Sequence, residues 1–384
     1  MGMQEKIEHF IKLMDGERGS YVPTMPELEP GYCCEYAGVD PMRAFWEYDG
    51  MIAAYQKVLQ DFEIDISLGL QFLSPQRSAL LGSRTWIQNR ENGTMQHPEV
   101  TALLDTEYEE FLSDPLKCIL ERVLPRMNCK LEGDPSERTL ALCQAVLFER
   151  NQNYDFYGKL TQVAQQMETP LYYGTMFYAP FDLLADHLRG IRQICTDMRR
   201  RPEPVEEACE TIAGLMLEYV PYTLPLPKNG FPFACAWVHL PPMIAPKQFE
   251  RFFWPSFRRV CDALAVQGYR LYLQFQGDYT DGKYYDYYQE LPQGKCVLAV
   301  EKQNIEKTVH MLAKGNLISC SYPVNHLKTL SEGDCLKKAG ELLDAAMPTG
   351  RCYFGTDKSV FGLRDADPEK LKAVLRFVHE KGRY

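Results

Sequence analysis

Acidic and amide side chains stand at the ends of short apolar runs in the last third of the chain. The run LYLQFQGD (271–278) places Gln274 and Gln276 in a stretch typical of a buried strand, and Asp278 follows Gly277. Glu301 comes directly after the apolar run CVLAV. An acid beside a desolvated wall can have its pKa raised and act as a general acid. We therefore expect a pocket with acid–base and hydrogen-bonding groups at these strand ends.

The same argument extends to other polar residues that end or follow an apolar run, because the carboxyl ends of parallel strands line one pocket. We predict catalytic, proton-handling roles for three acids and substrate-binding roles for seven further residues. The acids are Asp65, Glu301 and Asp278. The substrate-binding group is His239, Gln274, Gln276, Tyr178, Asp182, Thr356 and Asp357.

Several of these residues also have a simpler, structural interpretation. Asp182 suits the N-cap of a helix, which is the favoured interpretation, and Asp186 would then be exposed on the same helix. Glu301 fits a cap as well as it fits a site. His239, at the end of ACAWVH, is compatible with a satisfied structural histidine or with a pocket wall. The sequence leaves the last two choices open.

Alternating strands and helices are expected to position these residues. In the last third, apolar runs at 269–275, 296–300, 316–320 and 351–355 alternate with helical patterns at 245–266, 304–314, 331–346 and from 367 onward. Ser331 and Asp367 are the expected N-caps, and Pro255 either kinks its helix or starts a second one. This order predicts a parallel sheet in an α/β fold.

The first two thirds give a less regular pattern. Helical spacing covers 51–58, 181–198 and 204–220, and the residues around 64–66 favour a strand. Residues 76–115 are expected to be irregular. Residues 20–50, rich in Pro, Gly and Tyr, are expected to be loops. We expect a single domain over 1–384, of which residues 1–50 form an N-terminal extension of helix and loops.

Composition excludes several classes of partner. The 384 residues carry a net charge of −10, and the densest basic run, at 198–201, is short. This argues against nucleic acid and anionic membranes as partners. No apolar run approaches the roughly 20 residues of a bilayer span, and residues 1–20 predict an amphipathic helix rather than a signal peptide. The 13 cysteines include no CxxC pair and are expected to be reduced thiols in the cytoplasm.

Two stretches resemble the uroporphyrinogen decarboxylase superfamily. MFYAPFDLLADHLRGIRQICTDMRRRPEPVEEA (176–208) has a Pro-Phe turn, an Arg-Gly and a second helix after Arg-Pro-Glu. HLPPMIAPKQFERFFWPSFRRVCDALAVQGYRLYLQFQGD (239–278) is similar to the element that leads a strand into the site. The resemblance runs from about residue 35 and implies a (β/α)8 barrel. The superfamily contains porphyrinogen decarboxylases and cobalamin-dependent methyltransferases, which move a methyl group between a corrinoid protein and a thiol or folate.

The zinc ligands of the thiol-using methyltransferases are replaced here. Those enzymes carry His-x-Cys-Gly where this chain has Gln274 to Gly277, and a later cysteine where it has Thr356 and its neighbours. Glutamine is a poor zinc ligand because its amide oxygen is neutral and hard. The comparison implies no zinc site and no tightly bound cofactor, with a corrinoid carried by a partner protein.

The decarboxylase pattern is also incomplete. The arginine-rich loop of those enzymes corresponds to SYVPTMPELEPGYCCEYAG, which is acidic. Asp65 matches the family's early aspartate, but Asp186 stands at the tyrosine position and Thr356 near the histidine position. A polycarboxylate substrate would be repelled by this loop.

Three functions follow as hypotheses. The first is a corrinoid-dependent methyltransferase with a small, non-thiol acceptor or donor. The second is a decarboxylase or other lyase acting on a tetrapyrrole or small carboxylic acid, with Asp65 as the proton-handling group. The third is a non-catalytic barrel that binds a partner. A homodimer is compatible with each of them.

Overall fold

The centre of the protein is a parallel sheet of six strands. They are β3 (Tyr173–Met176), β4 (Phe233–Val238), β5 (Leu271–Tyr279), β6 (Cys296–Gln303), β7 (Leu317–Tyr322) and β8 (Cys352–Thr356). Each strand pairs with the next along the chain, so the sheet order is the chain order. The computed structural model, which describes residues 1–70, 73–89, 93–223 and 233–384, confirms the predicted α/β class. The resemblance implies a barrel of eight strands, whereas the parallel sheet within the described residues has six.

Two extended segments lie against the edges of this sheet. The amide of Met25 donates to the carbonyl of Phe354 in β8 (2.8 Å), and the amide of Ile66 donates to the carbonyl of Thr24 (3.1 Å). The amide of Tyr172, directly before β3, donates to the carbonyl of Ser67 (3.0 Å). Backbone hydrogen bonds therefore lead from β8 through residues 24–25 and 66–67 to the start of β3.

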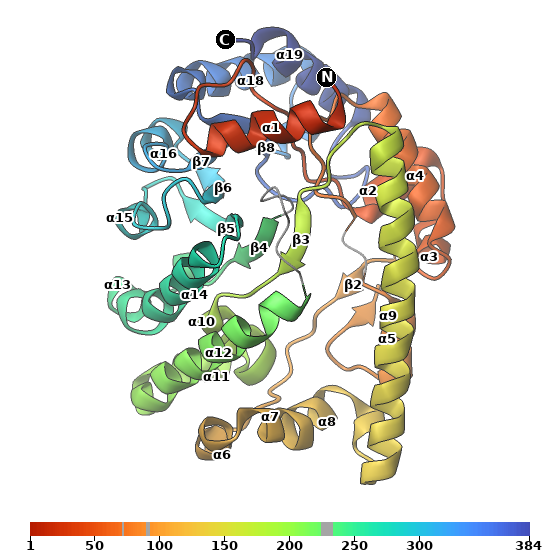
Figure 1. Ribbon diagram of the computed structural model, residues 1–384, viewed down its shortest axis with the longest axis vertical. Helices are drawn as coiled ribbons and strands as arrows, with labels where there is room; N and C mark the ends of the chain where they lie inside the picture. The colour runs from red at the N-terminus through yellow and green to blue at the C-terminus, as the bar shows by residue number, and fades with distance from the viewer. Residues whose placement is uncertain (71–72, 90–92, 224–232) are drawn as a thin grey trace.

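Helices surround the sheet (Figure 1). In the first half they are α1 (Met3–Met14), α2 (Pro30–Ala37), α3 (Pro41–Ala44), α4 (Asp49–Asp61), α5 (Pro75–Leu81), α6 (Tyr108–Ser113), α7 (Pro115–Cys118), α8 (Leu124–Met127), α9 (Pro135–Gln166), α10 (Pro180–Leu183) and α11 (Ile191–Arg200). The second half holds α12 (Pro202–Thr223), α13 (Pro246–Gln248), α14 (Trp254–Val266), α15 (Tyr285–Tyr288), α16 (Ile305–Leu312), α17 (His326–Thr329), α18 (Glu332–Ala346) and α19 (Pro368–Lys381). A two-stranded hairpin, β1 (Ile87–Gln88) and β2 (Met95–Gln96), precedes α6.

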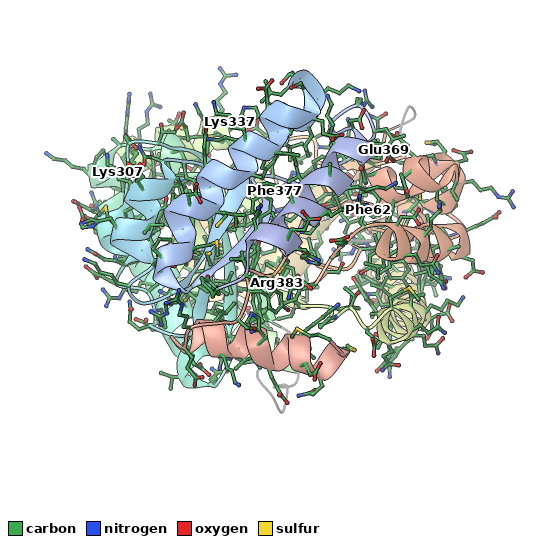
Figure 2. All side chains as sticks on the ribbon, turned by 90° about the horizontal axis from the view of Figure 1, so that it is seen from above. Phe62, Lys307, Lys337, Glu369, Phe377 and Arg383 are labelled. Atoms are coloured by element: carbon green, nitrogen blue, oxygen red, sulfur yellow. The ribbon has the colours of Figure 1, made fainter. Side chains whose placement is uncertain are left out.

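Local chemistry explains where the later helices begin. Ser331 and Asp367 accept backbone N–H groups as the N-caps of α18 and α19, which confirms both predictions. Pro255 lies in the first turn of α14, after a π-helical turn at Phe249–Phe253, and so starts a second helix. Figure 2 shows α18 and α19 side by side, with Phe377 on α19.

The sheet and α1 enclose a separate apolar core. Phe10, Leu13 and Met14 of α1 are fully buried against strand residues such as Phe233 and Tyr353. The predicted amphipathic N-terminal helix therefore exists, and its apolar face covers the inside of the sheet. Among the residues described, no helix has both the length and the hydrophobicity to span a membrane.

Candidate functional site

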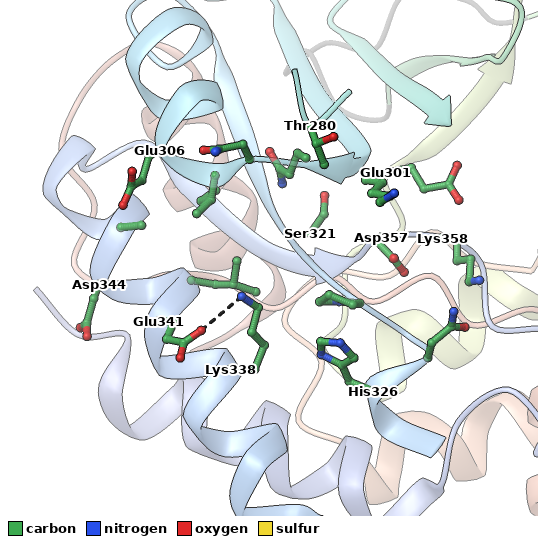
Figure 3. Close-up of a pocket in the computed structure, with 18 residues that line it drawn as sticks. Thr280, Glu301, Glu306, Ser321, His326, Lys338, Glu341, Asp344, Asp357 and Lys358 are labelled. Atoms are coloured by element: carbon green, nitrogen blue, oxygen red, sulfur yellow. Dashed lines mark hydrogen bonds and ion pairs between the residues drawn. The ribbon is translucent and has the colours of Figure 1, made fainter. Parts of the chain in front are cut away.

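A cavity of about 1120 Å³ lies at the carboxyl ends of β6, β7 and β8. Glu301, Ser321 and Asp357 line it from the strand ends, and α16 and α18 supply further walls. Figure 3 shows these three residues toward one end of the pocket and Glu341 and Asp344 toward the other. The structure thus brings Glu301 and Asp357 together in a pocket where the sequence predicts one.

Glu301 is held by a glycine of the neighbouring strand. The register of β5 and β6 shifts between Phe275 and Asp278, and Gly277 there has φ +107°. A Cβ at Gly277 would lie 2.8 Å from the ring of Pro242, so only glycine fits. The amide of Gly277 donates to Oε2 of Glu301 at 2.6 Å. This bond fixes the Glu301 carboxylate at the pocket wall.

The half-buried carboxyl of Asp357 is placed for proton exchange. Its Oδ1 accepts the amide of Val324 at 3.0 Å. Burial raises the pKa of Asp357 to about 6, against the opposing effect of the Val324 bond, and the charge of Glu301 adds to the rise. Near neutral pH, Asp357 can therefore both give and take a proton.

A second carboxyl, Glu27, lies completely buried behind this wall. It accepts the hydroxyl of Tyr272 (2.6 Å), the side-chain amide of Gln274 (3.0 and 2.9 Å to its two oxygens) and the hydroxyl of Ser359 (3.2 Å). Burial raises the pKa of Glu27 although these three donors lower it, and the charge of Asp357 raises it further. Its own amide donates to Oγ1 of Thr356 at 3.0 Å, so Thr356 supports Glu27.

Glu27 fixes which way the Gln274 amide points. Because Nε2 of Gln274 donates to both Glu27 oxygens, its Oε1 faces away from them. The side chain is 1% exposed, and Oε1 has no hydrogen-bond partner within the described part of the chain. Gln274 therefore offers an unused acceptor inside the sheet, and Gln276, two residues further on, is half-buried at the strand end.

Glu29 is a second buried carboxyl in the same segment as Glu27. Burial raises its pKa to about 7, while Ser359 opposes the rise and the charge of Glu27 supports it. Neither Glu27 nor Glu29 was predicted from the sequence to have a role. The signal for them is the alternation of Met25, Glu27 and Glu29 in MPELE, since alternate residues of an extended segment share one side.

A histidine–aspartate cluster lies beyond the ends of β3 and β4. Oδ2 of Asp182 accepts the backbone amide of His239 at 3.0 Å, and the His239 Nε2 bonds Asp186. Asp182 is not an N-cap, because Ala179 holds that position of α10. Asp186 is not exposed, since its side chain retains 13% of its accessible area. Both structural interpretations from the sequence are wrong because the carboxylates turn toward His239.

Charges within this cluster set the protonation of its imidazoles. Burial lowers the pKa of His239, but the bond to Asp186 and the charges of Asp182 and Asp186 outweigh it, so the pKa is raised. Burial raises the pKa of Asp182 to about 7, opposed by His239. Burial and His97 lower the pKa of His187 to about 4. His239 is thus the imidazole of the cluster that favours its charged form.

Tyr178 belongs to the same cluster, where it packs edge-on against His187 with ring centroids 5.1 Å apart. The His187 ring lies 4.6 Å from that of His97, which follows β2. Three predicted substrate-binding residues, Tyr178, Asp182 and His239, therefore share one cluster, apart from those lining the β6–β8 cavity.

Asp65 and Asp278 do not take the catalytic positions that the sequence suggests. Oδ2 of Asp65 accepts the amide of Thr24 (3.0 Å) and bonds Nε2 of His379 (2.8 Å) on α19. Its neighbour Ile66 instead joins the core inside the sheet, so Asp65 points outward. Asp278 is exposed and ion-paired with Lys302, and it does not line the cavity.

The donor set at the positions that match the zinc ligands of the thiol-using methyltransferases does not suit a metal. Nε2 of Gln274 is bound to Glu27, and only a neutral amide oxygen remains at that position. In residues 1–70, 73–89, 93–223 and 233–384, no group of three or more His, Cys, Asp or Glu side chains has an arrangement that could hold a metal ion.

Comparison of the sequence with models of known protein families and with curated proteins gives no match. The functional argument therefore rests on the geometry of the cavity and of the buried carboxyls behind it.

Proposed function

We propose that the protein is a (β/α)8-barrel enzyme of the uroporphyrinogen decarboxylase superfamily, and that it transfers a methyl group between a corrinoid protein and a small, non-thiol substrate. The six parallel strands support the barrel. The hydrogen bonds that link β8, residues 24–25, residues 66–67 and the start of β3 would close the ring with two further strands.

The observation that carries the non-thiol assignment is the bond between Gln274 and Glu27. Thiol-using relatives would carry a zinc ligand at Gln274, and zinc would activate the thiol as a thiolate. Here the amide is fixed on a buried carboxyl and presents only an oxygen acceptor. The position supports hydrogen bonding to a substrate or to water and leaves no group that would activate a thiol.

The lining of the cavity indicates the class of substrate. Five acidic and three lysine side chains face it, and two of the lysines already have carboxylate partners: Lys338 binds Glu341 (3.2 Å) and Lys302 binds Asp278. The third lysine, Lys358, adjoins Asp357 and opposes the rise of its pKa, and five carboxyls against three lysines leave the lining acidic overall. Such a pocket favours a cationic or hydrogen-bond-donating substrate, such as a methylated amine, and disfavours a polycarboxylate.

The residues present also suit a corrinoid at the mouth of the cavity. Corrinoid rings carry amide side chains, and Gln303, Asn304 and Asn325 line the cavity with matching amides. The corrinoid would supply or accept the methyl group when its carrier protein docks.

The chain's own contribution is binding and proton handling. Glu301, fixed by Gly277, holds the positive end or a donor of the substrate. Asp357 exchanges a proton with the substrate heteroatom: it donates when the methyl group leaves and accepts when the heteroatom gains one. Glu27 and Thr356 support this wall from behind.

The test combines methylcobalamin with amines, folates and thiols and follows the corrinoid absorption spectrum together with the methylated product. We expect transfer with a non-thiol substrate, no thiol methylation, and less than one tenth of a zinc per chain. The Asp357→Asn variant should lose transfer, whereas the exposed control Asp278→Asn should keep it. Thiol methylation with stoichiometric zinc would overturn the proposal. Failure to bind any corrinoid, folate or amine would favour a non-catalytic barrel.

A second candidate, a carboxy-lyase, is supported by three carboxyls whose pKa values are raised toward neutral pH: half-buried Asp357, to about 6, and buried Glu29 and Asp182, to about 7. In that reaction a carboxylate leaves as CO2, and one of these acids protonates the carbanion that remains. Release of CO2 from small carboxylic acids without added corrinoid, lost in Asp357→Asn, would select this function over methyl transfer.

A further inference from the structure

Two strand-end side chains, Glu301 on β6 and Ser321 on β7, point toward the same space. Val297 pairs with Leu317 across these two strands, and both belong to the apolar core inside the sheet. Glu301 and Ser321 each lie four residues further along, so by the same register they are neighbours and face the same side. Both line the β6–β8 cavity, as Figure 3 shows.

The hydroxyl of Ser321 has hydrogen-bonding capacity that the fold leaves unused. Ser321 is 4% exposed, and its Oγ has no hydrogen-bond partner in the part of the chain that the structure describes. Buried hydroxyls are normally paired, because burial without a partner is unfavourable. The neighbouring strand β8 places Gly355 opposite Ser321, and a glycine has no side chain to pair with it. Ser321 therefore offers a hydrogen-bonding group to a molecule in the cavity.

Two carboxyls lie beside this hydroxyl. Oε2 of Glu301 accepts the Gly277 amide at 2.6 Å, and Oε1 accepts no hydrogen bond from the described residues. Asp357, two residues beyond Gly355, lines the same end of the cavity. Lys358 lines it as well and offsets part of their charge. The strand end of the cavity thus combines negative charge with oxygen acceptors that a ligand can occupy.

We propose that this end of the cavity binds an ammonium group that carries at least one N–H, such as a di- or trimethylammonium, and rejects a quaternary ammonium. The inference rests on the proposed amine substrate and narrows its class. An N–H can be donated to Oγ of Ser321 or to Oε1 of Glu301, whereas a nitrogen with four methyl groups leaves both acceptors unpaired. Asp357 can also take a proton from an N–H ammonium, and a quaternary nitrogen has none to give.

The composition of the lining favours the same choice. Proteins recognise quaternary ammonium ions through the faces of aromatic rings. Among the described residues, no Phe, Tyr or Trp side chain lines this cavity. Its walls instead carry oxygen acceptors, which include the amides of Gln303, Asn304 and Asn325. The positive charge of a substrate is therefore recognised through hydrogen bonds, and these require an N–H.

A matched pair of cations tests this selectivity without a corrinoid. Trimethylammonium and tetramethylammonium carry the same charge and differ by one methyl group, but only trimethylammonium has an N–H. Isothermal titration calorimetry of the full chain at pH 7 should show trimethylammonium binding at least about 10-fold more tightly. Equal affinities, tighter binding of tetramethylammonium, or binding of neither ion would overturn the inference.

Ser321→Ala tests whether the hydroxyl makes the distinction. The variant should bind trimethylammonium about 10-fold more weakly and should bind tetramethylammonium as the wild type does. Ser319→Ala is the matched control, because Ser319 is a buried serine on the same side of β7 that does not line the cavity. A Ser321→Ala variant that loses affinity for both ions equally, or that behaves like Ser319→Ala, would refute the role of Ser321.

The methyl-transfer assay separates this inference from the proposed function. Preferential binding of trimethylammonium without any transfer in the presence of methylcobalamin would support the selectivity and reject the proposed function. Transfer to or from amines together with equal affinities for the two ions would support the proposed function and reject the selectivity.

Discussion

Both carboxylate oxygens of Glu27 lie within hydrogen-bonding distance of the side-chain nitrogen of Gln274, at 3.0 and 2.9 Å. The two residues are 247 positions apart and both are buried. Their contact joins the N-terminal segment to the middle of β5. It also determines which end of the amide is free, and this decides what Gln274 can offer to a ligand.

Glu27→Ala should destabilise the protein. The substitution leaves the Tyr272 hydroxyl and the Gln274 amide without an acceptor and opens a cavity, which outweighs the relief from no longer burying a carboxyl. We expect a loss of roughly 2–4 kcal/mol in the free energy of unfolding, measured by urea denaturation. Asp278→Ala, at an exposed site, should change it by less than about 0.5 kcal/mol. Equal free energies of unfolding for the two variants would show that the contacts of Glu27 do not stabilise the fold.

Asp186→Asn should lower the pKa of His239. The Asp186 carboxylate is the first of the groups that raise this pKa against burial, so its removal lets burial dominate. NMR titration of the histidine ring signals checks the result, with a drop of about one unit expected. The distant Asp278→Asn serves as the control and should leave His239 unchanged. An unaltered His239 titration in Asp186→Asn would mean that the two side chains are not in contact in solution.

The strands of the last third could be predicted because each is a short apolar run between a helix end and a helix start. Residues 296–300 and 351–355 are examples: β6 extends the first run by three residues, and β8 is shifted from the second by one. Helix boundaries at Ser331 and Asp367 were equally accessible, since both residues cap through their own side chains. These signals depend only on neighbouring residues, so a single sequence is enough to detect them.

The candidate site could be predicted only in part, because side-chain direction is not local. Glu301 and Asp357 were found from their places at strand ends. Asp65 was misassigned, since one residue of register turns a strand side chain from the inside to the outside. The alternation of Met25, Glu27 and Glu29 indicates that these side chains share one side, but the partner of Glu27, Gln274, is remote in sequence. Nothing local reports such a contact.

His379→Gln should weaken folding in a particular pH range. Burial alone would raise the pKa of Asp65, but its contacts with His379 and Thr24 lower this pKa below the ordinary 3.8. Burial alone would lower the pKa of His379, but its contact with Asp65 raises this pKa above the ordinary 6.5. Asp65 therefore contributes stability above pH 3.8, which is lost as pH falls. His379 contributes stability below pH 6.5, and this stability is lost as the pH rises through the pKa of His379 in the folded protein.

The loss of stability in His379→Gln should consequently be largest between pH 4 and 6.5, at about 2 kcal/mol, and smaller at pH 9. Urea denaturation at pH 5.5 and pH 9 measures it. A loss that is the same at both pH values would indicate that packing of the ring, and not its charge, holds α19 against Asp65.

Asp357→Asn should increase the free energy of unfolding, in contrast to His379→Gln. A carboxyl whose folded pKa is about 6, above its ordinary 3.8, favours the folded state only below pH 3.8 and costs stability as pH rises through 6. Asparagine removes this cost while its oxygen can still accept the Val324 amide. The variant should match the wild type near pH 3.5 and be more stable by about 2 kcal/mol at pH 7.5, measured by urea denaturation. A gain in stability together with lost turnover would identify Asp357 as a group kept for chemistry at the expense of folding. Lost stability at pH 7.5 would instead show that its charged form is held by contacts that the folded chain provides.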